Sequence, residues 1–449
     1  MLQTVKGVLT ALESRLDQPT ARGLATAVIR ALRDGDLLPG QRLPPIRTVA
    51  VELGLSPTTV SAAWALLARS GKLHTDGRRG TTLALPRLAG SPRYERALDR
   101  QGAFDLDLST GVPDPTLLPD LGHALSSLTS AASPGSYLDD PVVAELAEVL
   151  RADWPYDATE LTVVDGAMDA LELVTRVLVG FGDRVAVEDP CFPPLLDLLE
   201  ASGAEIVGVP LDDEGMSADA LTGAGPLTAV YLQPRAHNPT GRSLTPVRAR
   251  QLAEVLRGGT AVVVEDDSAG AIAATEAISL GRWLPERTVH VRSFSKSHGP
   301  DLRLAALSGP AEIVARITAL RHLGQGWSSR LLQRLLLGLL TDARAIGQVA
   351  RAREQYAARR TAMVAALADL GVAVGGTDGI NLWVPVLDET AAVLRLARQG
   401  IGVTPGAPFA VRPGHRPHVR VTVGLVADGH AGLAEAIAAA ARGSVRFRV

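Results

Sequence analysis

Residues 293–303 read S-F-S-K-S-H-G-P-D-L-R and contain Lys296, one of only three lysines in a chain of 449 residues. The other two are Lys6 and Lys72, although lysine and arginine together number 45. An arginine-rich composition accounts for the scarcity of lysine, but not for a lysine between serines, seven residues before Arg303. A primary amine forms an imine with an aldehyde, whereas a guanidinium stays protonated and is a poor nucleophile. The stretch therefore indicates a position that needs an amine.

Strand-like apolar runs surround this stretch and alternate with helical segments. The runs lie at residues 184–187, 205–209, 228–232, 261–264 and 289–292, and the helical segments include residues 167–180 and 244–257. This alternation predicts an α/β domain with a largely parallel sheet. Ligands of such sheets bind at the carboxyl ends of the strands, so the residues after each run are candidates for a site.

Those residues form a coherent chemical set that has an aromatic ring, an amide, carboxylates, a lysine and an arginine. They are Asp189-Pro190-Cys191-Phe192, Arg235-Ala236-His237-Asn238-Pro239-Thr240-Gly241, Glu265-Asp266-Asp267, Ser293-Phe294-Ser295-Lys296 and Arg303. An aldehyde cofactor that carries a phosphate and a pyridine nitrogen would use every kind of group in this set. The sequence therefore predicts such a cofactor at this edge of the sheet.

From about residue 105 onward the chain resembles fold-type I aminotransferases. The motif N-P-T-G at residues 238–241 and the spacing from Lys296 to Arg303 carry the resemblance. It implies pyridoxal 5'-phosphate (PLP) as the cofactor and Lys296 as the catalytic residue, which would hold PLP as an internal aldimine.

The resemblance also assigns roles to the surrounding side chains. Asp266 would keep the pyridine nitrogen protonated, Asn238 would hydrogen-bond the phenolic oxygen, and Phe192 would stack on the ring. The phosphate would be bound by a helix N-terminus, two hydroxyl groups and a guanidinium. The residues implied for that group are Gly166, Ala167, Met168, Ser293, Ser295 and Arg303.

Two further positions match residues that act on a partner or a ligand. Tyr137 matches a tyrosine that in the family reaches across a dimer interface, and Arg420 matches the arginine that clamps the α-carboxylate of an amino-acid ligand. Taken singly, these positions also fit simpler roles. Phe192 and Tyr137 suit ordinary packing, Arg420 suits a surface charge, Asp266 suits a cap at a strand end, and Cys191 suits a small packed residue.

One departure from the family pattern affects the expected activity. Aminotransferases place a tyrosine two or three residues after the pyridine-binding aspartate, whereas this chain has Ser268 and Ala269 there. Loss of the phenol alters the pKa of an imine and weakens proton transfer at the α-carbon, a step that also needs Lys296. Imine exchange with an incoming amine survives this loss better than transamination, so the sequence favours sensing over turnover.

The first part of the chain has a different charge balance from the rest. Residues 21–85 contain eight arginines and one lysine against four acidic residues, a local net charge of +5, whereas the whole chain carries −3. A basic module on an acidic body is typical of a part that meets an anionic polymer. A solvated basic surface is the alternative that charge alone leaves open.

Helix, glycine turn and helix follow one another in this basic part. Leu24 lies on the apolar face of the first predicted helix and Val49 on that of the second, with Gly54 in the turn that follows. Ser56 suits the N-cap of a third helix. This order predicts a helix-turn-helix, and residues 71–85 read as a small hairpin beside it.

The same part resembles the winged helix-turn-helix domain of GntR-type regulators over nearly all of residues 20–85. The residues that carry the resemblance are Leu38-Pro39-Gly40, Arg42-Leu43-Pro44, Arg47, Leu53-Gly54-Leu55-Ser56, Thr58-Thr59-Val60 and the wing residues 77–81. It implies a phosphate contact for the arginine of the second helix and groove contacts for the third helix and the wing. The implied DNA-binding residues are Arg47, Ser56, Thr58, Thr59, Arg78, Arg79 and Gly80. Pro57 replaces an arginine that reads a base in many relatives, which shifts weight toward phosphate contacts and DNA shape.

The two parts in this order resemble MocR-type transcriptional regulators over essentially the whole chain. We expect a multidomain fold, with a winged helix-turn-helix domain and an α/β PLP-dependent transferase (fold-type I) domain that has a small C-terminal subdomain. The expected parts are an N-terminal extension of unknown role at residues 1–19, the winged domain at 20–85, a linker at 86–104, and the aminotransferase-like domain at 105–449, with its subdomain at roughly 343–449. The resemblance implies a homodimer that binds a double-stranded DNA operator.

Composition predicts a cytoplasmic protein. Apolar runs are shorter than the roughly 18 residues of a membrane span, and the N-terminal residues lack an apolar signal core. Cys191 is the only cysteine, so no disulfide within the chain is expected. Histidine and cysteine show no metal-ligand spacing.

Three functions fit these observations. The first is a transcriptional regulator whose aminotransferase-like domain dimerises and senses PLP or an amino compound through aldimine chemistry. The second is an active PLP-dependent aminotransferase with an appended DNA-binding domain. The third is a plain repressor whose second domain only dimerises, and the intact set of Lys296, Asp266, Asn238 and Arg303 argues against it. The sequence leaves the effector, the operator and the direction of regulation open.

Overall fold

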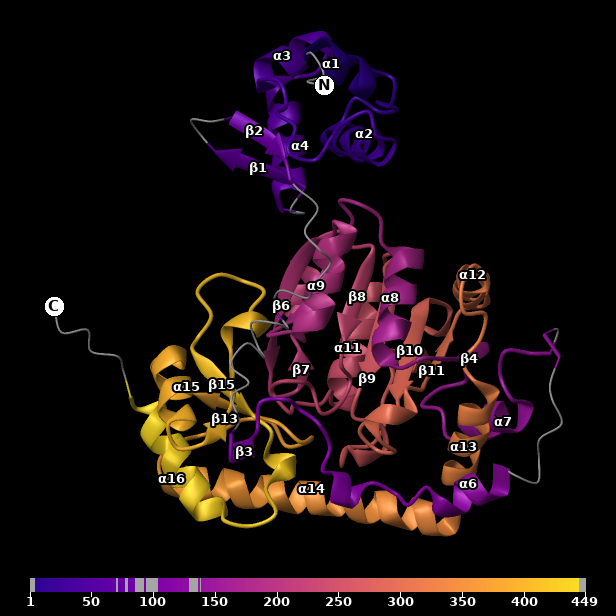
Figure 1. Cartoon of the computed structure of the whole chain (residues 1–449), viewed down its shortest axis with the longest axis vertical. Helices are drawn as coiled ribbons and strands as arrows, with labels where there is room; N and C mark the ends of the chain where they lie inside the picture. The colour runs from indigo at the N-terminus through magenta and orange to yellow at the C-terminus, as the bar shows by residue number, and fades with distance from the viewer. Residues whose placement is uncertain are drawn as a thin grey trace. The chain divides into compact units, whose positions relative to one another are not determined.

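The computed structural model describes residues 5–69, 72–76, 80–84, 93, 104–128, 136–137 and 139–443. These residues form two compact units (Figure 1). The smaller unit is built on the N-terminal residues, and the larger unit holds most of the chain from Arg93 onward.

The N-terminal part of the smaller unit contains four helices and a hairpin among its described residues. Its elements are α1 (Val5–Glu13), α2 (Ala21–Arg33), α3 (Ile46–Glu52), α4 (Pro57–Arg69), β1 (Leu73–Asp76) and β2 (Gly80–Leu83). The two strands pair antiparallel, from Leu73 opposite Leu83 to Asp76 opposite Gly80. Leu24, Val49 and the apolar stripe of α4 lie in one buried cluster, which confirms the predicted apolar faces.

The turn between α3 and α4 has the predicted chemistry. Gly54 adopts a φ of +63°, a left-handed conformation that glycine reaches without steric cost. Ser56 caps α4, because its Oγ accepts a hydrogen bond of 3.0 Å from the backbone N–H of Thr59. The sequence order of helix, glycine turn and helix is therefore observed.

Helix α1 gives a structural role to the N-terminal extension. Val8, Ala11 and Leu12 are buried in the same apolar cluster as the helix-turn-helix. The linker predicted at residues 86–104 lies outside the described residues, apart from Arg93 and Phe104. In the described part of the chain no single helix is long and apolar enough to cross a membrane, although Ile46–Glu52 and Pro57–Ala68 pass that test together as a bent pair.

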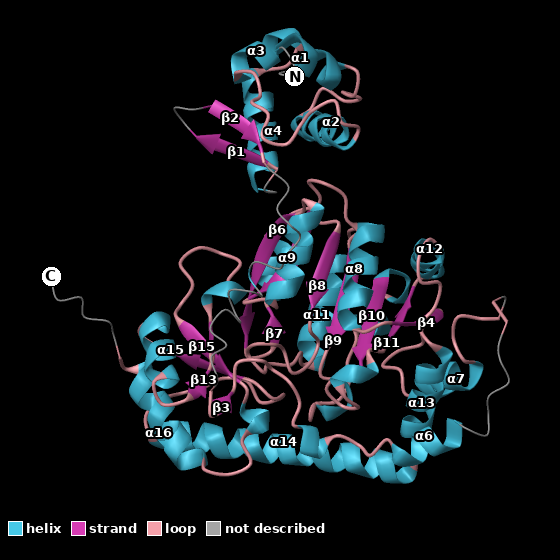
Figure 2. Cartoon of the chain, in the orientation of Figure 1, coloured by secondary structure: helices cyan, strands magenta, loops and turns pink. Residues whose placement is uncertain are grey.

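The larger unit contains a sheet of eight strands among the described residues, in the order β4-β11-β10-β9-β8-β5-β6-β7 (Figure 2). Their bounds are β4 (Glu160–Val164), β5 (Arg184–Asp189), β6 (Glu205–Asp212), β7 (Gly215–Met216), β8 (Ala229–Leu232), β9 (Val262–Asp267), β10 (Thr288–Ser293) and β11 (Ala305–Gly309). β8, β9 and β10 pair in parallel, whereas β11 pairs antiparallel with β10 and β4, and β7 pairs antiparallel with β6. The sheet is therefore mixed, and β4, β7 and β11 were not predicted.

Helices cover both faces of this sheet. They include α8 (Ala167–Leu178), α9 (Pro193–Ser202), α10 (Ala218–Thr222), α11 (Pro246–Arg257) and α12 (Ala311–His322). Alternate residues of β8 divide between the two faces: Val230 packs with the apolar side of α11, and the Tyr231 hydroxyl lies 2.9 Å from Thr175 of α8. Both faces are buried, as expected for strands with continuous apolar runs.

The C-terminal part of this unit has its own core. Its elements are α14 (Ala343–Asp369), β12 (Leu382–Pro385), α15 (Glu389–Ala397), β13 (Ile401–Gly402), β14 (Thr404–Pro405), β15 (His418–Val421) and α16 (His430–Ala441). β12, β15 and β14 form an antiparallel sheet, while β13 pairs with β3 (Leu106–Asp107). The remaining helices, α6 (Gly122–Leu128), α7 (Ala144–Ala152) and α13 (Arg330–Thr341), form a separate cluster with β4 and β11. The long helix α14 runs along one side of the unit (Figure 1).

Candidate functional site

The predicted site lies at the carboxyl ends of the parallel strands. Gln233 directly follows β8, Asp266 lies near the end of β9, and Lys296 comes three residues after β10. Parallel pairing in register, with Leu232 opposite Glu265 and Val291 opposite Asp266, brings these ends to one edge. The segments that follow β9 and β10 add further polar groups at this edge, among them Ser268.

Asp266 differs from the two acidic residues beside it. Glu265 is held by Ser279 and His290 at 2.5 and 2.7 Å, and Asp267 forms an ion pair of 2.7 Å with Arg235. Asp266 accepts one hydrogen bond of 2.7 Å from Gln233 Nε2 on its Oδ2 atom. Its Oδ1 atom is buried and has no partner among the described residues. Only this carboxylate therefore keeps an oxygen ready for a donor from a ligand.

Burial raises the pKa of Asp266, although Gln233 and Lys296 oppose that shift. A buried carboxylate is costly without a positive or hydrogen-bonding partner. A protonated ring nitrogen would supply the missing donor and would favour the ionised form of Asp266. This chemistry fits the pyridine nitrogen of PLP.

Lys296 presents its amine to the same place. Its Nζ donates to Ser268 Oγ at 3.4 Å, and the side chain is partly exposed. Burial lowers the pKa of Lys296, Asp266 opposes the shift, and the positive charge of Arg420 adds to it. A lower pKa leaves a larger fraction of the amine neutral at a given pH, which is the form that attacks a carbonyl carbon.

Asn238 and Arg420 meet beside this amine. Asn238 Oδ1 accepts hydrogen bonds of 3.4 Å from Arg420 Nη1 and from Asn381 Nδ2. Arg420 is 6% exposed, and its guanidinium lies 5.3 Å from the ring centre of Phe409. Its Nη2 atom also donates to the carbonyl of Ser109. Arg420 is therefore a buried cation that faces the site, not a surface charge.

A second group of predicted residues lies at the start of α8. Gly166 is buried and has a φ of +101°, and a Cβ atom there would lie 3.4 Å from the Arg303 guanidinium. Arg303 is itself left-handed, at a φ of +48°, and donates to the carbonyl of Asp165 at 3.4 Å. Ala167 begins α8, so its N-terminal amides and the Arg303 guanidinium lie together. This glycine-lined cradle suits a phosphate.

The other residues assigned to the phosphate have fewer contacts of their own. Ser293 ends β10, and its Oγ accepts a hydrogen bond of 3.3 Å from the backbone N–H of Ser295. Met168 lies in the first turn of α8 and is partly buried. No hydrogen bond joins these three residues to Arg303 in the described structure.

Phe192 and Tyr137 have different surroundings. Phe192 lines a small cavity of about 10 Å³ together with Asp266 and Gln233, so it lies next to the carboxylate. Tyr137 is 88% exposed, and its ring contacts Trp327 at 5.9 Å. Among the described residues, no hydrogen bond or ring contact joins Tyr137 to the cluster around Lys296. Such an exposed ring is compatible with the cross-dimer role that the sequence suggested.

Three residues of the site were missed from the sequence. Gln233 joins two predicted residues, because its Nε2 donates to Asp266 and its Oε1 accepts from the backbone N–H of Asn238, both at 2.7 Å. Its position directly after an apolar strand was a signal that could have identified it. Ser268 was noted only as a substitute for tyrosine, and its Oγ lies within 3.4 Å of Lys296 and Gln233. No local sequence pattern marks Asn381 as a residue of the site.

In the smaller unit, the predicted DNA-binding residues lie on or next to the helix-turn-helix. Arg47 is exposed on α3, and Ser56 and Thr58 are exposed at the start of α4, where Thr59 is half-buried. Ser56 Oγ lies 2.7 and 2.8 Å from the hydroxyls of Thr58 and Thr59. These groups form one polar surface at the N-terminus of α4.

Only part of the predicted wing can be placed. Arg78 and Arg79 lie outside the described residues. Gly80 begins β2 with a φ of +89°, and a Cβ atom there would lie 2.7 Å from Arg42 Nη2. Glycine at this position therefore lets the Arg42 side chain pack against the hairpin.

The fold and the two sites define a DNA-binding regulator fused to an aminotransferase-like domain. A profile for "Bacterial regulatory proteins, gntR family" matches residues 20–83, and one for "Aminotransferase class I and II" matches residues 105–437. The chain belongs to the MocR-type branch of the GntR transcriptional regulators, and its larger domain to the class I and II aminotransferase family, which typically binds PLP.

Individual relatives support this assignment. The chain is 35% identical over 428 residues to the vitamin B6 salvage pathway transcriptional repressor PtsJ of Salmonella typhimurium. This match covers 92% of this chain and 96% of PtsJ. It is 29% identical over 438 residues to the HTH-type transcriptional regulator TauR of Rhodobacter capsulatus, with coverages of 86% and 88%. The α-aminoadipate aminotransferase LysN of Thermus thermophilus shares the fold of the larger domain, with a TM-score of 0.68 at 23% identity over 78% of this chain and 98% of LysN.

The lowered pKa of Lys296 predicts selective chemistry at this amine. In the cofactor-free protein near neutral pH, reductive methylation with formaldehyde and cyanoborohydride should modify Lys296 before Lys6 and Lys72, because more of its amine is neutral. Peptide mass spectrometry over a time course measures the three rates. Lys6 and Lys72 are exposed and serve as internal controls. A rate at Lys296 that is no faster than theirs would contradict the prediction.

Proposed function

We propose that this regulator binds PLP through Lys296, forms a homodimer through its aminotransferase-like domain, and senses PLP or an amino compound there while its winged domain binds operator DNA. The observation that carries the proposal is the buried Oδ1 atom of Asp266, which has no partner among the described residues and lies beside the Lys296 amine. A structural carboxylate would have both oxygens satisfied, as those of Glu265 are.

Each residue of the cluster has a definite task in this proposal. PLP, when bound, supplies an aldehyde carbon that a primary amine attacks and a pyridine ring that withdraws electrons. Asp266 would hold the proton on the ring nitrogen, and Asn238 would donate to the phenolic oxygen through its amide. Gly166 and Arg303 would hold the phosphate, which fixes the ring relative to the Lys296 amine.

The site favours recognition over turnover. The tyrosine of aminotransferases is replaced, and Ser268 contributes the hydroxyl that contacts Lys296. A serine hydroxyl is a much weaker acid than a phenol and assists proton transfer less. Arg420, buried beside Asn238, suits the carboxylate of an amino compound, since arginine binds carboxylates through two parallel hydrogen bonds. We therefore propose an effector with an amine, or PLP itself, as the signal.

The relatives and the smaller unit support the regulatory half of the proposal. PtsJ is named as a repressor of a vitamin B6 salvage pathway and TauR as an HTH-type regulator. In this chain, Arg47, Ser56, Thr58 and Thr59 would contact the operator, with Arg78, Arg79 and Gly80 of the wing beside them. An effector changes DNA binding only if it binds the two conformations of the protein with different affinities.

A working aminotransferase is the second candidate function. The intact cluster of Lys296, Asp266, Asn238 and Arg420 favours it, because a purely regulatory site has less need of a lysine that can move a proton. The two candidates differ in one measurable product. Sustained formation of a keto acid from an amino donor supports the enzyme, whereas a single half-reaction without turnover supports the sensor.

The cofactor assignment predicts a visible absorption band. Purified protein mixed with PLP should turn yellow, and Lys296→Ala should lose the band, because no amine remains for the aldehyde. Arg420→Ala should keep the band but no longer respond to carboxylate-bearing amines. Absorption spectra recorded during titration with PLP and then with amino acids measure both effects. A wild-type protein that never takes up PLP would overturn the cofactor assignment.

Gln233 should act as a positioning residue for this site. Gln233→Leu removes one hydrogen bond from Asp266 and one from the Asn238 backbone, at a cost of about 1–3 kcal/mol for the groups left unpaired. We expect PLP affinity to fall roughly tenfold or more, since 1.4 kcal/mol corresponds to a factor of about ten. Spectroscopic titration measures the dissociation constant. Gln399→Leu, an exposed glutamine on the same unit, is the control and should bind PLP normally.

Arg47 should contribute a phosphate contact. Arg47→Ala should weaken binding to a duplex selected by the protein from a random-sequence library, and should lower the slope of log affinity against log salt by about one unit. Fluorescence anisotropy at several salt concentrations measures this slope. Arg395→Ala, which removes an exposed arginine of the larger unit, is the matched control. An unchanged slope in Arg47→Ala would remove this residue from the DNA contacts.

A further inference from the structure

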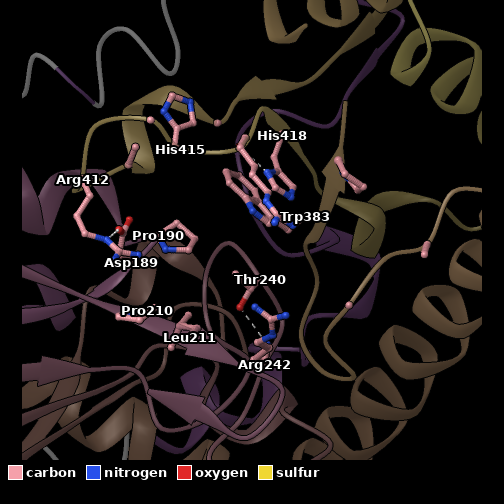
Figure 3. Close-up of a pocket in the computed structure, with 17 residues that line it drawn as sticks. Asp189, Pro190, Pro210, Leu211, Thr240, Arg242, Trp383, Arg412, His415 and His418 are labelled. Atoms are coloured by element: carbon pink, nitrogen blue, oxygen red, sulfur yellow. Dashed lines mark hydrogen bonds and ion pairs between the residues drawn. The ribbon is translucent and has the colours of Figure 1, made fainter. Parts of the chain in front are cut away.

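A cleft of about 600 Å³ in the larger unit is not used by the site at Lys296. One wall comes from the main sheet and the segment after β8, with Asp189, Pro190 and Arg242, and the opposite wall comes from the C-terminal sheet, with Trp383 and His418 (Figure 3). The volume lies within the range of roughly 300–1,000 Å³ that is typical of small-molecule sites.

The cleft is preformed, because hydrogen bonds hold the loop of residues 406–418, which lines it, at both ends. On one side, Asp189 accepts hydrogen bonds from the backbone N–H of Val411 at 3.1 Å and from Arg412 Nε at 2.6 Å. On the other side, Glu389 accepts from the backbone N–H groups of Ala407 and His418 at 2.8 and 3.0 Å. A ligand would therefore not have to order this loop when it binds.

The rings of Trp383 and His418 stack on each other in the cleft and form a platform, with centres 4.9 Å apart and planes 7° from parallel. Figure 3 shows the two rings lying one over the other. Burial lowers the pKa of His418, which favours the neutral imidazole. The outer face of the stacked pair is a π-surface on which a planar ring can stack.

Arginines outnumber carboxylates among the described residues that line the cleft, and Glu389 beside it pairs with His415 at 3.1 Å. Arg242, Arg412 and Arg416 line the cleft, whereas Asp189 is its only carboxylate among the described lining residues, and Arg412 already pairs with it at 2.6 Å. No carboxylate within the described chain pairs with Arg416. The cleft therefore favours an anionic ligand.

Arg242 is the cation best placed to bind an anion. Its Nε atom is buried and has no hydrogen-bond partner in the described structure. Its Nη2 atom pairs at 3.1 Å with Asp213, whose side chain is 89% exposed and so contributes little attraction. In Figure 3 the Arg242 guanidinium points from the main-sheet side toward Trp383. An anion in the cleft would thus meet a guanidinium with donor capacity left.

We infer that this cleft is a second ligand site, which binds a small anion carrying a planar aromatic ring. The ring stacks on the outer face of the Trp383–His418 pair, and the anionic group accepts hydrogen bonds from Arg242 and Arg416. Phe409 lies between this platform and the other site, because its ring centre is 5.4 Å from that of Trp383 and 5.3 Å from the Arg420 guanidinium. A ligand in the cleft would therefore affect Arg420 through the Phe409 ring. Only this link to Arg420 rests on the proposed function.

Phenyl phosphate is a suitable probe, because it has a ring and a phosphate but no aldehyde or amine. The PLP-loaded full-length protein should be titrated by isothermal calorimetry, so that the phosphate cradle at Gly166 is filled. We expect saturable binding of one probe per chain, and weaker binding of inorganic phosphate, which lacks the ring. Absence of saturable binding at millimolar phenyl phosphate would overturn the proposal.

Variants assign the binding to the cleft. Trp383→Leu and Arg242→Met should each weaken phenyl phosphate binding by roughly tenfold, the effect of losing a stacking or charge-assisted contact. Arg176→Met removes an exposed arginine paired with Glu172 in α8, and should bind like the wild type. Equal binding by Arg242→Met and the wild type would overturn the site even if Trp383→Leu fails to fold.

Lys296→Ala separates this inference from the proposed function. The variant should still bind phenyl phosphate, and Arg242→Met should still weaken binding in that background. Probe binding in Lys296→Ala that Arg242→Met no longer weakens would place the probe in the emptied phosphate cradle of the first site and overturn the second. If the wild type shows no PLP absorption band, the proposed function fails, while the difference between wild type and Arg242→Met still decides the cleft.

Discussion

A carboxylate buried at the edge of a sheet must find partners or become protonated, and Asp266 places this constraint on the larger unit. One oxygen is held by Gln233, and the other has no partner among the described residues. The surrounding groups are arranged around that opening. Lys296 supplies a nearby positive charge. Gln233 holds Asn238 as well as Asp266, because its amide oxygen accepts a hydrogen bond from the Asn238 backbone N–H. The unpaired Asp266 Oδ1 atom is stabilised when a hydrogen-bond donor binds to it, and a protonated heteroaromatic ring is such a donor.

The same constraint explains why the neighbouring acids are not part of the site. Side chains alternate along β9, so Asp267 points away from Asp266 and is neutralised by Arg235. Glu265 is satisfied by a hydroxyl, a backbone amide and an imidazole. Three consecutive acidic residues thus have three different electrostatic environments, and only one of them keeps capacity for a ligand. Ser268 stands where aminotransferases have a tyrosine, so a serine hydroxyl, a much weaker acid than a phenol, lies beside Lys296.

We propose that the larger unit holds two chemically different sites, the cluster around Lys296 and the cleft beside Trp383. Both lie against the C-terminal sheet. Arg420 of β15 faces Asn238, and His418 of the same strand stacks on Trp383 of β12. Phe409 contacts both Trp383 and Arg420. Close packing of this kind transmits small displacements, because a ring in van der Waals contact on both sides cannot move without its neighbours.

The sequence by itself determined the order of the parts, the helix-turn-helix with its glycine turn and serine cap, and the five central strands, and it nominated part of the proposed cofactor site. These features follow from local rules: left-handed geometry at Gly54, capping by Ser56, and the position of polar residues after apolar runs. Only the tertiary structure decided the rest. β11 has mostly small residues and no β-branched one, so the antiparallel edge was missed. Asn381, just before β12, and Trp383, within β12, lie more than a hundred residues from Asn238 and Arg242, and no local pattern encodes such a distance. The spare capacity of Asp266 and of Arg242 is likewise a property of three-dimensional neighbours, since hydrogen-bond satisfaction depends on groups that meet only in the folded chain.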